Sequence, residues 1–191
     1  MENIKIIRAQ TQEDCDICDR FLEELCKFET QFDSTIEPFI GGKHHNLNNI
    51  ISNNVYLAYA MINGTPAGYI MGYLKNQKGS GNNTNIVNLS TLFVKEEFRK
   101  KRVGTTLYTS FENWTKENFG NDFALEVTVI NGNDKAFEFY KSLGFSPIRT
   151  TFRKWLFILK YIKQKHLAFC KVFYFIFQFL HHFHLTKLCH W

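Results

Sequence analysis

A run of four cations, Arg99-Lys-Lys-Arg102, joins an apolar stretch to an amphipathic one. The apolar stretch, 89–94, predicts a β-strand, and the residues that follow Gly104 have the apolar spacing of a helix. The first N–H groups of a helix have no partner within it, and the helix dipole favours negative charge there. The order of strand, glycine-containing loop and helix therefore predicts an anion site. The four cations strengthen that site, and a phosphate is the expected ligand.

A second segment whose residues could take part in a reaction begins with the apolar residues 123–130, which predict another strand. Asn133 or Asp134 can cap the helix that follows, and Gly144 suits the left-handed residue at the end of that helix. The apolar side chains between them recur at helical spacing: Ala136, Phe139, Tyr140 and Leu143. Tyr140 thus brings a phenol, which can donate a proton, onto a predicted helix.

Together these two segments resemble the GNAT superfamily of acetyl-CoA-dependent N-acetyltransferases. That family has a strand followed by Arg/Gln-x-x-Gly-x-Gly/Ala at a helix start, and later Asn-x-x-Ala and Phe-Tyr-x-x-x-Gly-Phe. The matching positions here are Arg99-x-x-Arg102-x-Gly104, Asn133-x-x-Ala136 and Phe139-Tyr140-x-x-x-Gly144-Phe145. The resemblance covers residues 4–156 and has one departure, because Arg102 stands where the family has its first glycine.

The resemblance implies that acetyl-CoA binds as the acyl-donor cosubstrate. The strand end would pair with the pantetheine arm, and the N–H group of Phe93 or Val94 would polarise the thioester carbonyl. Backbone N–H groups of the basic loop and first helical turn would hold the pyrophosphate, and Asn133 would contact the pantetheine or its neighbouring backbone. The implied donor-binding residues are Leu92, Phe93, Val94, Arg99, Lys100, Lys101, Arg102, Val103, Gly104, Thr105, Asn133 and Tyr140.

The implied reaction is direct transfer within a ternary complex, in which Tyr140 protonates the departing thiolate. An alkylammonium, with a pKa of about 10, must lose a proton before it can attack a carbonyl. Some family members use an acid four residues before the position of Leu92, but here that position is Asn88, which cannot act as a base. The alternatives that stay open are Glu126, Glu29, Asp33 and an ordered water.

The other elements must position these residues. The patterning predicts a strand over 4–9 and a helix that starts at the capping sequence Thr11-Gln-Glu-Asp14. An irregular helix is expected within 37–51, followed by the hairpin strands 54–62 and 65–74, which Asn63-Gly64 joins. Two further strands are expected over 86–94 and, last in the chain, over 148–156. The first helix has an apolar stripe of Ile17, Phe21, Leu25 and Phe28, and an acidic, solvated face of Asp16, Asp19, Glu23 and Glu24. The expected fold is a mixed α/β domain, GNAT-like, with a largely antiparallel central sheet flanked by helices and an atypical hydrophobic C-terminal tail.

Charge divides the 191-residue chain at residue 156. The net charge is +5, and the tail 157–191 carries five lysines without an arginine or an acid, so residues 1–156 carry 18 basic and 18 acidic side chains. We therefore expect one acetyltransferase domain over 1–156 that does not bind nucleic acid through its charge. The start of the chain has no apolar core of a secretory signal, and five cysteines form no disulfide pattern, so a reducing cytoplasm is expected.

The tail 157–191 has three interpretations. It contains an apolar piece, 167–180, which is shorter than the about 20 residues needed to span a bilayer. The tail either lies on an anionic membrane surface as a cationic amphipathic helix, or packs on the body or forms a homodimer contact, or is an unselected extension beyond the normal end of the domain. The last interpretation is favoured slightly, because its bias toward Phe, Lys, Ile, His and Leu fits an unselected sequence.

Two other groups of potential ligands have plainer interpretations. Cys15-x-x-Cys18 lies on the predicted first helix toward its apolar stripe, and no second such pair follows, so buried, inert thiols are expected. His44-His45 lies in a polar loop and is expected to be a surface pair. The histidines of the tail have no recognised ligand spacing, so no metal site is expected.

The function predicted from these observations is N-acetylation of a primary amine of a small molecule. Acetylation of a protein lysine or N-terminus is an alternative, and a non-catalytic acyl-CoA-binding module is another, which Asn88 keeps open. The acceptor should be chosen by residues 27–51 and 77–85, which carry no motif.

Overall fold

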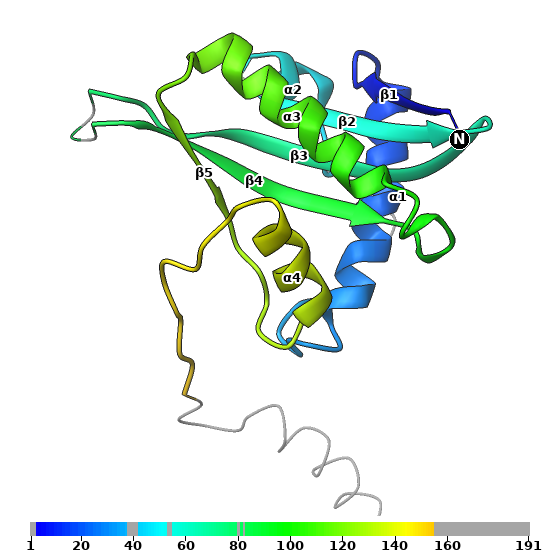
Figure 1. The fold of residues 1–191 in the computed structure, drawn as a ribbon. Helices are drawn as coiled ribbons and strands as arrows, with labels where there is room; N and C mark the ends of the chain where they lie inside the picture. The colour runs from blue at the N-terminus through cyan, green and yellow to red at the C-terminus, as the bar shows by residue number, and fades with distance from the viewer. Residues whose placement is uncertain (1–2, 38–41, 53–54, 80, 82, 155–191) are drawn as a thin grey trace, which may run out of the picture. The chain divides into compact units, whose positions relative to one another are not determined.

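The computed structural model describes residues 3–37, 42–52, 55–79, 81 and 83–154. Those residues form five strands and four α-helices, with one short 3-10 turn (Figure 1). In chain order these are β1 (Ile4–Arg8), α1 (Gln12–Glu29), α2 (Leu47–Ser52), β2 (Val55–Ile62), β3 (Thr65–Asn76), β4 (Asn85–Val94), η1 (Glu96–Phe98), α3 (Val103–Phe119), β5 (Phe123–Val127) and α4 (Asp134–Ser142). The predicted mixed α/β class is confirmed.

A single sheet with the strand order β1-β2-β3-β4-β5 forms the centre of the fold. The first four strands are antiparallel neighbours, and β5 joins β4 in parallel. The Asn63-Gly64 turn joins β2 to β3, and both residues have positive φ (50° and 79°), as a tight type I′ turn requires. The expectation of a largely antiparallel central sheet is therefore also confirmed.

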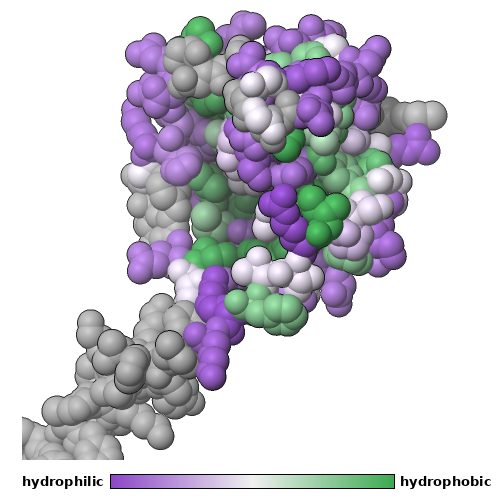
Figure 2. Space-filling model, turned by 90° about the vertical axis from the view of Figure 1, so that its left-hand side faces the viewer, coloured by the Kyte–Doolittle hydropathy of each residue, from purple (hydrophilic) through white to green (hydrophobic). Residues whose placement is uncertain are grey.

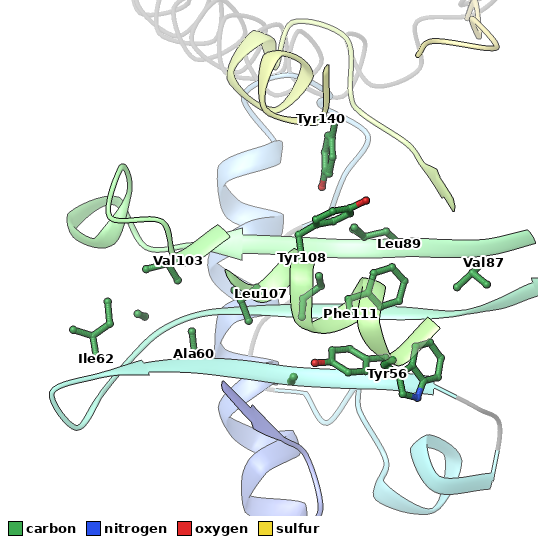
Figure 3. Close-up of a cluster of buried hydrophobic side chains, with 14 residues drawn as sticks. Tyr56, Ala60, Ile62, Val87, Leu89, Val103, Leu107, Tyr108, Phe111 and Tyr140 are labelled. Carbon is green, nitrogen blue, oxygen red and sulfur yellow. The ribbon is translucent and has the colours of Figure 1, made fainter. Parts of the chain in front are cut away.

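Helices cover both faces of the sheet (Figure 1). α3 packs on one face through buried side chains such as Phe111, and Figure 3 shows this core. α1 and α2 contribute Phe21 and Ile50 to a second core on the other face. Successive side chains of a strand point to opposite faces, so Ile70 enters the α3 core whereas Tyr69 enters the α1 core. Helices on both faces thus explain why β2 is apolar throughout and β3 is apolar between its exposed ends.

The start of α1 is the capping box that the sequence predicts. The Thr11 hydroxyl accepts a hydrogen bond from the Asp14 N–H group at 3.2 Å, and the Asp14 carboxylate accepts one from the Thr11 N–H group at 3.0 Å. This exchange satisfies two N–H groups that a helix start would otherwise leave unpaired. Tyr59 also donates to Asp14 at 2.9 Å, which ties the start of α1 to β2.

Asp19 and His45 are buried, and this corrects two expectations. Asp19 was predicted on a solvated face and His45 in a surface pair, yet they are only 5% and 3% exposed. The Asp19 carboxylate accepts hydrogen bonds from the N–H groups of His44 and His45, both at 3.0 Å, and lies 2.5 Å from His45 Nδ1. A buried carboxylate needs such partners, so this cluster fixes the loop before α2 onto α1.

The Cys15 and Cys18 side chains are fully buried in the α1 core, as predicted. Burial, assisted by the negative charge of Asp19, raises the pKa of the Cys15 thiol. Burial likewise raises the pKa of the Cys18 thiol well above its ordinary value. Both thiols therefore stay protonated at neutral pH, in which state they are poor nucleophiles and poor metal ligands. Within the described residues, no group of three or more potential ligands is arranged to hold a metal ion.

Three predicted elements differ from the structure. The strand expected over 123–130 ends at Val127. The irregular helix expected within 37–51 is reduced to α2, and residues 42–46 before it have no regular secondary structure. The strand expected over 148–156 is wrong for residues 148–154, which have no regular secondary structure and are exposed. Alternation of apolar residues predicts a strand only where an edge is available for pairing. The predictions for the tail 157–191 lie outside the described residues.

The chain divides into two compact units, Met1–Phe145 and Ser146–Trp191. The first unit contains all the helices and strands given above. On the side of the molecule shown in Figure 2, hydrophilic side chains surround a hollow in which hydrophobic ones gather. No helix of the described residues is long and apolar enough to cross a membrane.

Close packing of α3 on β3 depends on Gly72. A Cβ atom added there would lie 2.5 Å from Phe111 Cζ and 2.9 Å from the Asn88 carbonyl oxygen. We therefore expect Gly72→Ala to lower the free energy of unfolding by about 1–3 kcal/mol through overpacking. Urea unfolding measures this change, and the double variant with Phe111→Leu provides the control. The double variant should lose less stability than the two single losses combined, and simple additivity would contradict this explanation.

Candidate functional site

The edge of β4 is half covered, and this creates the main opening in the sheet. Pairing between β4 and β5 runs from Asn85 with Phe123 to Leu89 with Val127, and then stops. β4 continues to Val94 with β3 on one side only. Beyond this point the chain that follows β5 leaves β4 and leads into α4 (Figure 1). We call this side of residues 90–94 the open edge of β4.

The register decides which backbone groups face the open edge. The Lys95 N–H group donates to the Ala67 carbonyl at 3.0 Å, so it points toward β3. Backbone groups alternate along a strand, so the N–H group of Phe93 also points toward β3, and those of Leu92 and Val94 point away. A second observation agrees, because the Arg99 side chain reaches the Val94 carbonyl from the open edge (Nε to O, 3.0 Å). Of the two N–H groups that the resemblance implies for the carbonyl, only that of Val94 faces the opening.

The basic loop curls sharply between η1 and α3. Lys100 and Arg102 both have positive φ (62° and 65°), a conformation that L-residues rarely adopt. Arg102 is the residue before α3 and gives it no side-chain cap. Its carbonyl accepts the first intrahelical bond, from Thr106 N–H at 2.9 Å. The N–H groups of residues 103–105 therefore have no acceptor within the helix, which is the arrangement that the predicted anion site requires.

The four cations of the loop have different surroundings. The Arg99 guanidinium lies over the Phe28 ring at 5.3 Å, and its Nε donates a hydrogen bond to the Val94 carbonyl. This side chain therefore links α1, the loop and β4. Lys100 and Arg102 are exposed. Arg102 also lines a shallow groove of about 360 Å³, which sequence reasoning missed, with Ile6, Thr105, Thr106, Thr109, Ser110 and Asn113.

Gly104 marks close contact between α3 and its neighbours. A Cβ atom added there would lie 3.4 Å from Phe139 of α4 and 3.7 Å from Val94 of β4. The first turn of α3 is therefore in van der Waals reach of both elements. The three elements that carry the predicted donor-binding residues thus meet at one place.

α4 brings Asn133 and Tyr140 to the same region. The Asn133 side chain caps the helix by accepting from the Ala136 N–H group at 3.3 Å, as predicted. The Tyr140 ring packs against Phe139 and Phe145 with centroid distances of 5.3 and 5.6 Å. Figure 3 shows the ring extending from α4 with its hydroxyl toward β4.

Tyr140 remains a neutral phenol at physiological pH. Its side chain is buried, and burial raises its pKa above the ordinary value, with a further rise from the negative charge of Glu29. A group with such a pKa can donate a hydrogen bond to a developing anion without ionising itself.

The candidate bases lie in three different environments. Glu126 is paired with Lys75 at 2.7 Å. The Asp33 carboxylate accepts from the backbone and hydroxyl of Thr35, at 2.9 and 2.7 Å. Glu29 is half-buried at the end of α1, and burial raises the pKa of its carboxyl. A carboxyl with a raised pKa is a better proton acceptor than an ordinary one.

A family model described as the acetyltransferase (GNAT) family matches residues 19–145 of this chain. This range includes α1 from Asp19 onward, the sheet from β2 to β5, the basic loop, α3 and α4. No curated protein sequence matches the chain.

Solved structures similar to this chain share its fold. A mutant of the BH1408 protein from Bacillus halodurans superposes with a TM-score of 0.67 at 19% identity, covering 80% of this chain and 99% of that one. An aminoglycoside acetyltransferase from an uncultured soil metagenomic sample superposes with a TM-score of 0.56 at 20% identity, and the match covers 81% of this chain and 96% of that one. The aminoglycoside N-acetyltransferase AAC(6')-Iy, in complex with CoA, superposes with a TM-score of 0.58 at 13% identity, and the match covers 82% of this chain and 97% of that one.

Arg102 stores backbone strain at the start of α3. An L-residue in the left-handed region costs about 1–2 kcal/mol, and glycine costs about 0.5–1 kcal/mol more than other residues through the unfolded chain. Arg102→Gly should therefore raise the free energy of unfolding by about 0.5–1 kcal/mol, measured by urea unfolding. Lys116→Gly, inside the same helix, should instead lower it by a similar amount. Equal losses in both variants would mean that φ at Arg102 carries no strain.

Proposed function

The chain belongs to the GNAT acetyltransferase family, and on this basis we propose that it transfers an acetyl group from acetyl-CoA to a primary amine of a small molecule. The observation that carries the proposal is the open edge of β4, which ends beside the unpaired N–H groups of α3. An extended chain with amide groups fits the open edge of β4, and a pyrophosphate fits the N–H groups at the start of α3. We assign this activity to a domain over residues 1–156, in a reducing cytoplasm.

Donor binding rests mainly on the backbone. Leu92 and Val94 offer N–H groups at the open edge to the amides of the pantetheine arm. The N–H groups of residues 103–105, with Lys100 and Arg102 nearby, suit the pyrophosphate. Any residue supplies a backbone N–H group, which explains how the loop can have arginine at position 102 and still bind an anion.

Two groups act on the charges that acyl transfer creates. The Val94 N–H group supports the oxygen of the thioester carbonyl as it becomes negative. Tyr140 donates a hydrogen bond to the departing sulfur. A phenol, with a pKa of about 10, is a weaker acid than a thiol, near 8.5, and burial weakens Tyr140 further. Full proton transfer from Tyr140 therefore needs a replacement proton, which the attacking amine provides when its nitrogen becomes cationic.

Asn88 supports a second candidate function, a non-catalytic acyl-CoA-binding module. Asn88 lies within β4 opposite Tyr73 and Glu126, and its amide cannot accept a proton at neutral pH. Such a module would bind acetyl-CoA at the same open edge without releasing its thiol.

Acetyl-CoA binding and thiol release test the two functions in order. Acetyl-CoA at 100 times its Kd should stabilise the protein by about 2.7 kcal/mol, seen as a rise in Tm. Adding primary amines should then release free CoA thiol, detected with a thiol reagent. A Tm shift without thiol release from any amine would favour the binding module, and no shift would contradict both functions.

Replacement of Tyr140 by phenylalanine tests its role while keeping the ring. We expect Tyr140→Phe to lower kcat by about 100-fold, the lower end of the range for general acid catalysis, with the KM for acetyl-CoA unchanged. Tyr108→Phe is the matched control, because Tyr108 is also buried and its ring contacts the same Phe145. Equal kcat values for both variants would remove Tyr140 from the chemistry.

A further inference from the structure

The half-buried Arg99 side chain makes two contacts that fix it between α1 and the end of β4. Its Nε donates a hydrogen bond to the Val94 carbonyl oxygen at 3.0 Å. Its guanidinium lies over the Phe28 ring of α1, 5.3 Å from the ring centroid, where the negative face of the ring attracts the cation. The ring therefore helps to hold the Nε–H group against the open edge of β4.

The peptide unit that joins Val94 to Lys95 is held at both ends. The Lys95 N–H group donates to the Ala67 carbonyl of β3 at 3.0 Å. The Val94 carbonyl, on the opposite side of the same peptide unit, accepts from Arg99. A peptide unit is planar, so bonds to its N–H and to its C=O fix its orientation. At the open edge, the Arg99 side chain thus takes the place that a neighbouring strand would have.

The preceding peptide unit carries the N–H group that faces the thioester in the proposed reaction. The Phe93 carbonyl oxygen lies beside Gly68 of β3, where an added Cβ would meet it. The C=O and N–H groups of one peptide unit point in opposite directions in a strand, so the Val94 N–H group points to the open edge. This N–H group and the carbonyl that Arg99 holds belong to one residue. Movement of the carbonyl therefore shifts the Val94 Cα atom, and the N–H group with it.

The chemistry of acetyl-CoA explains why the Val94 carbonyl needs a partner from the protein. The amides of the pantetheine arm offer both N–H donors and carbonyl acceptors to a strand edge. The acetyl thioester at the end of that arm has a carbonyl acceptor and no N–H donor. Beside Val94 it can accept from the N–H group, but it has nothing to donate to the carbonyl. A backbone carbonyl that a ligand covers without a donor is costly, and Arg99 supplies the missing donor.

We propose that Arg99 is a positioning residue for acyl transfer, whose Nε–H group fixes the end of β4 so that the Val94 N–H group meets the thioester oxygen. This inference rests on the proposed function and adds to it the residue that aligns the reacting carbonyl. The Arg99 backbone N–H group is also occupied, because it donates to the Glu96 carbonyl at 3.2 Å. The main task of Arg99 is thus to hold the strand end rather than to hold the pyrophosphate.

The two tasks make different demands on the side chain at position 99. Holding a pyrophosphate by charge requires a cation, which lysine also supplies. Holding the Val94 carbonyl requires an N–H donor at the place of Nε. Glutamine puts its amide nitrogen as many bonds from Cα as arginine puts Nε, whereas lysine has a methylene group there and methionine a methyl group. Glutamine and methionine are similar in length and uncharged, so they differ mainly in this donor.

The test measures thiol release by the full chain with acetyl-CoA and, as acceptors, 2-phenylethylamine, sisomicin and a lysine peptide. Arg99→Gln should keep most of the kcat. Arg99→Met should lower kcat about 100-fold, the loss that a small displacement of the reacting groups can cause. Arg99→Lys should also lower kcat while leaving the KM for acetyl-CoA unchanged, because it keeps the charge and misplaces the donor.

Arg8→Gln is the matched control for the loss of a guanidinium that stacks on an aromatic ring. Arg8 lies over the Tyr56 ring at 4.5 Å, in the strand at the far edge of the sheet. This variant should lower the Tm without changing kcat or the KM for acetyl-CoA. The Tm of each Arg99 variant is measured as well, and kcat is compared at a temperature where every variant is folded. A loss of kcat then belongs to the site and not to unfolding.

Each outcome decides one point. A higher kcat in Arg99→Lys than in Arg99→Gln would show that the charge is what matters, and would overturn the inference while leaving the acetyltransferase function in place. Equal kcat values in Arg99→Gln and Arg99→Met would overturn it too, because the donor would then have no effect. No thiol release by the unmodified protein with any of these amines would overturn the proposed function, and this inference with it.

Discussion

The end of β4–β5 pairing at Leu89 and Val127 is the constraint on which the rest of the site depends. A strand that keeps one neighbour and loses the other presents backbone donors and acceptors that need partners. Arg99 occupies one of these groups, the Val94 carbonyl, and leaves the N–H groups of Leu92 and Val94 for a ligand. Because α3 begins a few residues later, the unpaired groups of a strand and of a helix start lie close together in the chain.

Helices pack on both faces of the sheet beside this opening. α3 packs closely on the sheet because Gly72 leaves room for the Phe111 ring, and the first turn of α3 at Gly104 lies next to Val94 of β4 and Phe139 of α4. The other face is closed by α1, whose end places Phe28 under the Arg99 guanidinium of the basic loop.

Much of the fold could be predicted from the sequence where the signals are local. The Thr11–Asp14 capping box, the Asn63-Gly64 turn and the Asn133 cap depend on residues within a few positions of one another, and all three are confirmed. The failures involve distant partners. Asp19 is buried only because the chain returns 25 residues later with His44 and His45, and residues 148–154 form no strand despite an apolar pattern.

The sequence by itself determined the order of most elements, the start of α3 after the basic loop and the residues that resemble a GNAT acetyltransferase, because spacing along one chain encodes them. Only the tertiary structure decided which groups face the opening. The register turns the N–H group of Val94 to the open edge and that of Phe93 to β3. Burial likewise separates Glu29 from the paired Glu126. Register and burial arise from contacts between residues far apart in the chain, which no local pattern records.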